Sequence, residues 1–232
     1  MIVKKIDIGI KSIDYAFHLG DIHIKLLKRH KEYRQVFSKI YETIKKRKTP
    51  NSIIYLAGDL VHSKLDLSPE CINLLQEFLR NLGDICPTIL IAGNHDCNLN
   101  NFSRLDSIEP VVNALNHPNI HYLKDSGIYQ FGGIDWVVMS VWEPPNNFIK
   151  ASDCTGTYKI ALHHGAVNKA QTDVGYKITN DHVSLDRFVG FNCVMLGDVH
   201  RRQTLQTYKE EFMEIDNKDL DKYLKKGWEI DE

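Results

Sequence analysis

The chain has 232 residues, a formal net charge of −1 at pH 7 and 43% hydrophobic residues. This length suits one large globular domain, with or without a small appendage, and the hydrophobic content supports a substantial core, which excludes a disordered chain. The near-zero charge argues against a generally basic nucleic-acid-binding surface, so a polyanionic substrate would have to be attracted locally.

Strand-like and helical patterns alternate along the chain, which is typical of an α/β layered fold. Tyr33, Phe37 and Ile44 recur with the spacing of one helix face, and Ser68-Pro69 is typical of a helix start. The second half is richer in sheet than in helix. The predicted elements are strands at 15–19, 53–57, 89–92, 128–131, 134–142, 158–163 and 193–196, and helices at 32–47 and 68–83.

Metal-binding side chains follow these apolar runs directly, in five short strings. In an extended segment residues two apart face the same way, so Asp21 and His23 can point at one ion, and Asp198 and His200 can do the same. Oxygen and nitrogen ligands without thiolate suit Mn, Fe or Zn. The strings are Gly20-Asp21-Ile22-His23, Gly58-Asp59, Gly93-Asn94-His95-Asp96, Leu162-His163-His164-Gly165 and Gly197-Asp198-Val199-His200.

Recurrence of such strings at strand ends predicts a two-metal hydrolytic centre, because no single segment can surround two ions. Two ions held ~3.5 to 4 Å apart can bridge a hydroxide and clamp a phosphoryl group. A metal-bound water with a pKa of ~7 then supplies the nucleophile without an activated serine or cysteine.

The ordered series DxH, GD, GNHD, HHG and GDxH resembles the calcineurin-like metallophosphoesterase superfamily over residues 14–206. The string from Gly58 to His62 further resembles the SbcD-type branch, the nuclease subunits of double-strand-break repair complexes, and residues 98–112 resemble members found in large viruses and phages. The resemblance implies a four-layer α/β/β/α sandwich of two packed mixed sheets flanked by helices. It also implies metal-dependent phosphodiester hydrolysis by a catalytic domain at residues 1–206.

The resemblance implies a ligand set and leaves two points open. Asp59 would bridge two divalent ions, for which Mn is expected first, with Fe or Zn as alternatives. His163 is the family match for the second ion, although His164 could ligate in its place. Asp198 stands where relatives carry a histidine, so it either ligates the second ion or weakens that site, and we expect ligation. The implied ligands are Asp21, His23 and His200 for one ion, Asp59 for both, and Asn94, His163 and Asp198 for the other.

Three further residues have roles by the same resemblance. His95 would contact the phosphate and protonate the leaving oxygen, and Asp96 would orient it through a hydrogen bond. His62 stands where the nuclease branch has a substrate-phosphate histidine. The basic run from Lys25 to Lys31 is either a solvated loop or a phosphate-backbone contact.

The carboxyl end departs from the resemblance. SbcD-type relatives continue with a DNA-contacting cap domain and a segment that binds an SMC-like ATPase, whereas only about thirty residues follow His200 here. Residues 207–232 are predicted to form a short tail without a DNA-capping domain, with a strand-like piece at 210–215 and a short helix capped by Asp216 or Asn217.

Three classes of function follow from these observations. We expect a DNA nuclease first, with DNA as its substrate and an SMC-like ATPase as a further expected partner. The alternatives are a small-molecule phosphodiesterase or phosphatase, and a non-catalytic scaffold subunit for such an ATPase. Five cysteines without a CxxC pair and no signal-like start predict an intracellular protein, in the host cell interior if the chain is viral. No apolar run approaches the ~20 residues that span a bilayer, so no membrane association is expected.

Overall fold

The computed structural model describes residues 2–101, 103–179 and 183–207. The chain divides into two units, Met1–Arg202 and Gln203–Glu232, and the fold described here is that of the first. The strand and helix predicted beyond residue 207 lie outside the described residues.

A four-stranded parallel sheet forms the first inner layer, in the order β2-β3-β4-β5. All five residues of β3 are buried, as its continuous apolar sequence predicts for a strand covered on both faces. The parallel pairing brings the carboxyl ends of the strands to one edge of the sheet. The strands are β2 (Tyr15–Leu19), β3 (Ser52–Leu56), β4 (Thr88–Leu90) and β5 (Ile120–Tyr122).

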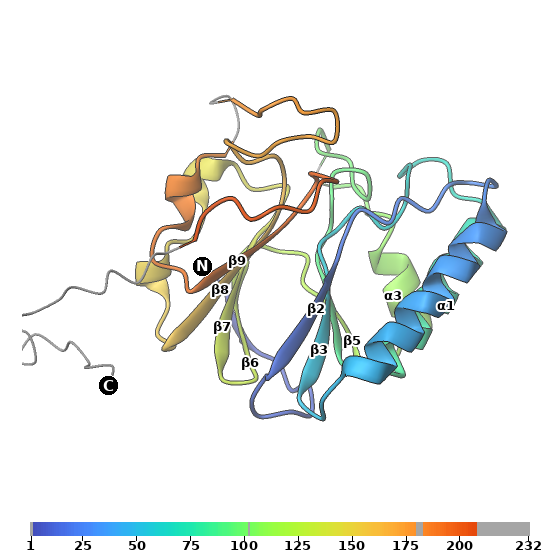
Figure 1. Cartoon of the computed structure of the whole chain (residues 1–232), viewed down its shortest axis with the longest axis horizontal. Helices are drawn as coiled ribbons and strands as arrows, with labels where there is room; N and C mark the ends of the chain where they lie inside the picture. The colour runs from blue at the N-terminus through green and yellow to red at the C-terminus, as the bar shows by residue number, and fades with distance from the viewer. Residues whose placement is uncertain (1, 102, 180–182, 208–232) are drawn as a thin grey trace, which may run out of the picture. The chain divides into compact units, whose positions relative to one another are not determined.

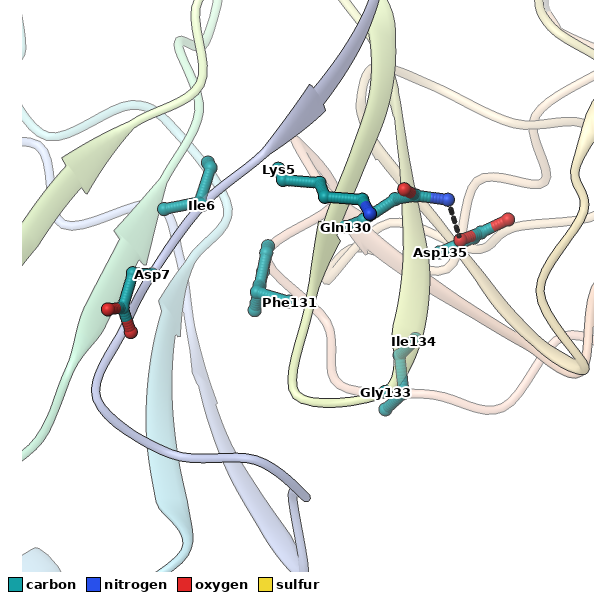
Figure 2. Close-up of a pocket in the computed structure, with 8 residues that line it drawn as sticks. All are labelled: Lys5, Ile6, Asp7, Gln130, Phe131, Gly133, Ile134 and Asp135. Atoms are coloured by element: carbon teal, nitrogen blue, oxygen red, sulfur yellow. Dashed lines mark hydrogen bonds between the residues drawn. The ribbon is translucent and has the colours of Figure 1, made fainter.

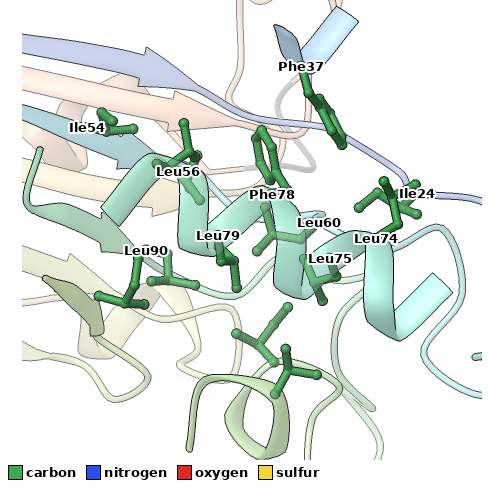
Figure 3. Close-up of a cluster of buried hydrophobic side chains, with 14 of the residues drawn as sticks. Ile24, Phe37, Ile54, Leu56, Leu60, Leu74, Leu75, Phe78, Leu79 and Leu90 are labelled. Carbon is green, nitrogen blue, oxygen red and sulfur yellow. The ribbon is translucent and has the colours of Figure 1, made fainter. Parts of the chain in front are cut away.

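Three helices, α1 (His30–Arg47), α2 (Pro69–Gly83) and α3 (Glu109–Leu115), lie on the outer side of this sheet (Figure 1). The Ser68 hydroxyl caps α2 by accepting the backbone N–H of Cys71. Alternate residues of β3, such as Leu56, pack against Phe78 and Leu79 of α2 (Figure 3). Burial of this apolar face stabilises the helices on the sheet.

A five-stranded mixed sheet forms the second inner layer, in the order β1-β6-β7-β8-β9. Only the β6–β7 pair is antiparallel. Tyr55 of β3 and Leu162 of β8 belong to the core cluster shared by the two sheets. The strands are β1 (Val3–Lys5), β6 (Gly127–Phe131), β7 (Ile134–Met139), β8 (Tyr158–His164) and β9 (Cys193–Gly197).

Short 3-10 helices accompany the outer face of the five-stranded sheet. They are η1 (Pro145–Asn147), η2 (Ala151–Asp153) and η3 (Leu185–Phe188). Phe148, which follows η1, and Phe188 of η3 lie against the ring of His163 on β8. Two packed sheets flanked by helices confirm the predicted α/β sandwich. Within the described residues, no helix is long and apolar enough to cross a membrane.

Several element boundaries differ from the prediction. The strand predicted at 134–142 ends at Met139, because the chain turns where the Glu143 N–H donates to Ser140 O and prolines follow at 144 and 145. The short strands β1 and β5 and the helix α3 were not predicted. A strand of three residues or a helix of seven is too short for its hydrophobic periodicity to be recognised in the sequence.

Candidate metal centre

Five chain segments meet where the strands of the two sheets end. The arrowheads of β2 and β9, from different sheets, point to this edge (Figure 1). The Asp21 N–H donates to Gly58 O at 3.1 Å, which joins the loops after β2 and β3. The Asp198 N–H donates to Asp21 Oδ1 at 3.0 Å, which joins the two sheets. The predicted convergence of strand-end side chains is therefore present.

Backbone strain is concentrated at this edge. Among the described residues, seven non-glycine residues have positive φ, and four of them are predicted ligands: Asp21, His23, Asp59 and Asp198. Their φ values are 55°, 49°, 52° and 86°. Such conformations cost free energy and persist where surrounding contacts enforce them, commonly at functional sites.

Two glycines permit the close approach of the loops. A Cβ on Gly58, whose φ is 91°, would lie 2.7 Å from Gly93 N and 2.8 Å from His164 Nδ1. A Cβ on Gly93 would overlap Oδ1 and the backbone nitrogen of Asp59. The loops after β3 and β4 can therefore meet beneath Asp59 only because these positions lack side chains.

We expect Gly93→Ala to displace Asp59 and to destabilise the protein by about 1–3 kcal/mol, the usual range for overpacking a closed site. Urea unfolding would measure the loss of stability, and the metal content would report the displacement of Asp59. Gly9→Ala is the matched control, since a Cβ at Gly9 meets nothing within 4 Å and only its φ of 76° is strained. Equal loss of stability in both variants would contradict the crowding argument.

His164 lies at the centre of the candidate site. Its Nδ1 donates to Ala57 O at 2.6 Å, so Nε2 is the nitrogen directed at the other candidate ligands. Nε2 is 3.0 Å from Asn94 Oδ1, 3.3 Å from Asp59 Oδ2 and 3.8 Å from Asp198 Oδ1. Second partners that fix a histidine ring in this way are typical of metal ligands.

His163, the ligand preferred from the sequence, points the other way. Consecutive strand residues face opposite sides of a sheet. Leu162 and His164 face the four-stranded sheet. His163 faces outward, donates from Nδ1 to Met139 O at 2.8 Å and packs against Phe148. The structure therefore corrects the preferred ligand from His163 to His164, the alternative left open by the sequence.

Three groups of side chains have ligand atoms close enough to hold a metal ion. All the ligand atoms within a group lie within 4.8 Å of one another. His23 Nε2 is also 3.1 Å from His200 Nε2 and 3.6 Å from Asp59 Oδ2, which connects the groups. The mixture of carboxylate and imidazole donors fits divalent Mn, Fe or Zn. The groups are Asp21, Asp59 and His164; Asp21, His23 and His200; and His23, His62 and His95.

The pKa values reflect a buried, negatively charged site. Burial acts to raise the pKa of Asp59, but the hydrogen bond and charge of His164 lower it overall. Burial acts to lower the pKa of His164, but the same pairing with Asp59 raises it to about 9. Burial lowers the pKa of His23 to about 4. Carboxylates that hold a proton on a buried imidazole would equally attract a divalent cation.

Asp198 and His200 both reach the centre from β9. Asp198 brings its carboxylate to the side of His164 and its backbone N–H to Asp21, and His200 Nε2 lies 4.0 Å from Asp21 Oδ1. The aspartate thus occupies a place from which it could ligate. Retained ligation by Asp198 stays a prediction.

His95 lies beside the centre, with its ring 4.8 Å from that of His23. Its Nδ1 donates to the backbone oxygen of His62 at 2.7 Å, which leaves Nε2 for a substrate. The predicted bond from Asp96 to this ring is wrong: Asp96 accepts the N–H groups of Gly93 and Val61 at 2.9 and 3.1 Å. Burial raises the pKa of Asp96 to about 7. Asp96 therefore holds the backbone of the two loops, and His62 orients His95.

A pocket elsewhere on the protein does not belong to this site. It lies between the end of β1 and the β6–β7 hairpin (Figure 2). Ile134, which lines it, pairs with Tyr158 at the start of β8, whereas His164 ends that strand. Asp135, also in the lining, is buried and accepts hydrogen bonds from Gln130 and from the backbone N–H groups of Thr155 and Gly156. The buried carboxylate of this pocket is therefore already satisfied by the protein.

Comparisons with known proteins show which family the chain resembles. The family described as calcineurin-like phosphoesterase matches residues 16–202. The chain is 44% identical over 210 residues to the uncharacterized protein R555 of Acanthamoeba polyphaga mimivirus, an alignment that covers 85% of this chain and 15% of that protein. The chain thus spans only a small part of that relative. It also resembles the crystal structure of Pseudomonas putida nuclease MPE, with 13% identity, a TM-score of 0.34 and coverage of 65% of this chain and 61% of that one.

Proposed function

The chain belongs to the calcineurin-like phosphoesterase family, and from that premise we propose that it is a metal-dependent phosphoesterase, an SbcD-like nuclease that hydrolyses phosphodiester bonds in DNA. We further propose two bound divalent ions, with Mn as the working metal. The ions would be held by His164 with Asp59, Asn94 and Asp198, and by Asp21, His23 and His200 with Asp59. When bound, they supply Lewis-acid activation of water and of the phosphoryl group.

The observation that carries the proposal of a nucleic-acid substrate is the local charge around the centre. Four basic residues, Lys25, Lys28, Arg29 and Lys31, follow the first ligand pair, and the next acidic residue is Glu32. Arg201 and Arg202 follow His200 directly. The chain as a whole carries a charge of −1, so these two segments are more basic than the chain average. Several cations spread over a surface strengthen the binding of a polyanion more than that of a small monoester, because a polyanion can contact more than one of them.

The residues of the chain itself have separable roles in the proposed reaction. His95 would give a proton from Nε2 to the leaving oxygen, with its ring fixed by the backbone oxygen of His62. The His95 N–H donates to Asp59 Oδ1 at 2.8 Å, so the position of the acid is tied to that of a candidate ligand. His62 has an exposed ring 5.8 Å from that of His95 and would contact the phosphate.

A non-catalytic scaffold is the weaker alternative. A scaffold has no need of four strained candidate ligands and a buried carboxylate beside a buried imidazole. All five cysteines are free, which supports the proposal of a reducing intracellular compartment. An SMC-like ATPase partner stays a prediction, to be tested by co-purification with the natural full-length protein.

Linear DNA, with bis-p-nitrophenyl phosphate as a small diester, provides the direct test. We expect the Mn-loaded protein to cleave both substrates, EDTA to abolish both activities, and the rate on DNA to fall steeply between 50 and 200 mM salt because phosphate contacts release counterions. Hydrolysis of the small diester alone would favour a small-molecule phosphodiesterase. Absence of both activities at full metal content would favour the scaffold.

A further inference from the structure

Lys64 lies beside the candidate centre, in contact with the backbone of Asn94. Its Nζ donates to the backbone oxygen of Asn94 at 3.2 Å. The side chain of Asn94 is turned to His164, and the next residue is His95. The ammonium is therefore held at the edge of the centre, next to the residue proposed to protonate the leaving oxygen.

Lys64 carries a charge that no salt bridge among the described residues neutralises. Within the described residues, no carboxylate lies within ion-pair distance of this half-buried ammonium. Asp66, the acid nearest in sequence, instead accepts a hydrogen bond from Ser63 at 3.3 Å. Lys124, by contrast, pairs with both Asp106 and Glu109. An ammonium has three donors, and within the part of the chain that the structure describes one of those of Lys64 is used, in the bond to Asn94 O.

We propose that Lys64 binds a phosphate flanking the one that is cleaved, on the leaving-group side, and so makes the enzyme prefer polynucleotides to small diesters. This inference rests on the proposed nuclease function. A buried or half-buried cation without a counter-ion is costly, and a substrate phosphate would provide that counter-ion. The bond to Asn94 reduces the freedom of a long side chain before the substrate arrives.

Activity on substrates with and without a flanking phosphate distinguishes phosphate binding by Lys64 from a purely structural role. We expect Lys64→Met to lower kcat/KM for a single-stranded oligonucleotide at least tenfold, through KM, as for loss of one charge-assisted hydrogen bond. Bis-p-nitrophenyl phosphate has no flanking phosphate, so its hydrolysis and the metal content should stay unchanged. Lys64→Arg keeps the charge and should recover most of the oligonucleotide activity.

Lys48→Met is the matched control, because Lys48 also donates from Nζ to a backbone oxygen, that of Ile85 at 2.8 Å. Lys48 precedes the start of β3 and Ile85 the start of β4, whereas the centre lies at the carboxyl ends of these strands. Lys48→Met should leave both substrates unaffected. Equal losses on both substrates for Lys64→Met would overturn the inference and indicate that Lys64 only positions Asn94. If the unmodified protein cleaves the small diester and no polynucleotide, the proposed nuclease function has failed instead.

Binding in EDTA gives a readout that does not depend on turnover. Fluorescence anisotropy of a labelled oligonucleotide should show weaker binding to Lys64→Met than to the unmodified protein. The slope of log K against log salt should also fall by about 0.7, the value for one phosphate contact to a single strand. An unchanged affinity and slope would contradict the inference.

Discussion

Replacing His164 with alanine is expected to remove metal and activity together, with a loss of more than about 100-fold in kcat/KM. Changes to groups that merely orient a ligand cost about 10- to 100-fold, so loss of the ligand itself should cost more. His164 Nε2 is within 3.3 Å of both Asn94 Oδ1 and Asp59 Oδ2, which makes it the only imidazole that joins these two among the described residues. Metal content by mass spectrometry, measured beside the rate, would show whether the loss comes from the ions.

His163→Asn is the control next to it in the chain. Asparagine can still donate to Met139 O, so the main cost should be lost packing against Phe148 and Phe188, about 1–2 kcal/mol of stability. Metal content and kcat should be retained. The opposite pattern, with metal lost from His163→Asn and kept in His164→Ala, would restore His163 as the ligand.

The two histidines also show what the sequence could predict. The apolar run before the two histidines predicts the strand β8. The strings at the strand ends predict the position of the centre, because the connections of a parallel sheet allow few topologies. The alternation of faces was available in principle, because Leu162 is apolar and shares its face with His164. What could not be predicted is which face of β8 meets the other sheet, since this depends on packing between residues far apart in the chain.

Asp96 shows a second limit of the sequence. Its place directly after His95 suggested a bond between the two side chains, yet both of its oxygens accept backbone N–H groups of the loops. A buried backbone N–H without an acceptor costs free energy, whereas the accessible ring of His95 can bond to water. The carboxylate of Asp96 therefore accepts the buried N–H groups and not the ring. Sequence spacing identifies such an acid as important but cannot choose between its partners.

His95→Ala is expected to lower kcat on DNA by about 10²- to 10⁴-fold while metal content stays near two ions, because general acid catalysis contributes about that much. His95 belongs to only one of the three donor groups, and His23, which also belongs to it, keeps its own contacts with His200 and Asp59. The ligands of the proposed ions should therefore survive the substitution.

The leaving group decides whether His95 acts as an acid. The oxygen that leaves a DNA strand is a poor leaving group and needs a proton, whereas p-nitrophenolate departs readily without one. Loss of a general acid should therefore slow DNA cleavage far more than hydrolysis of bis-p-nitrophenyl phosphate. His62→Ala keeps the backbone oxygen that orients His95. If His62 contacts the scissile phosphate, this substitution should lower kcat/KM on both substrates to a similar degree. Equal losses on the two substrates for His95→Ala would instead assign His95 to phosphate binding and leave the proton source to another group.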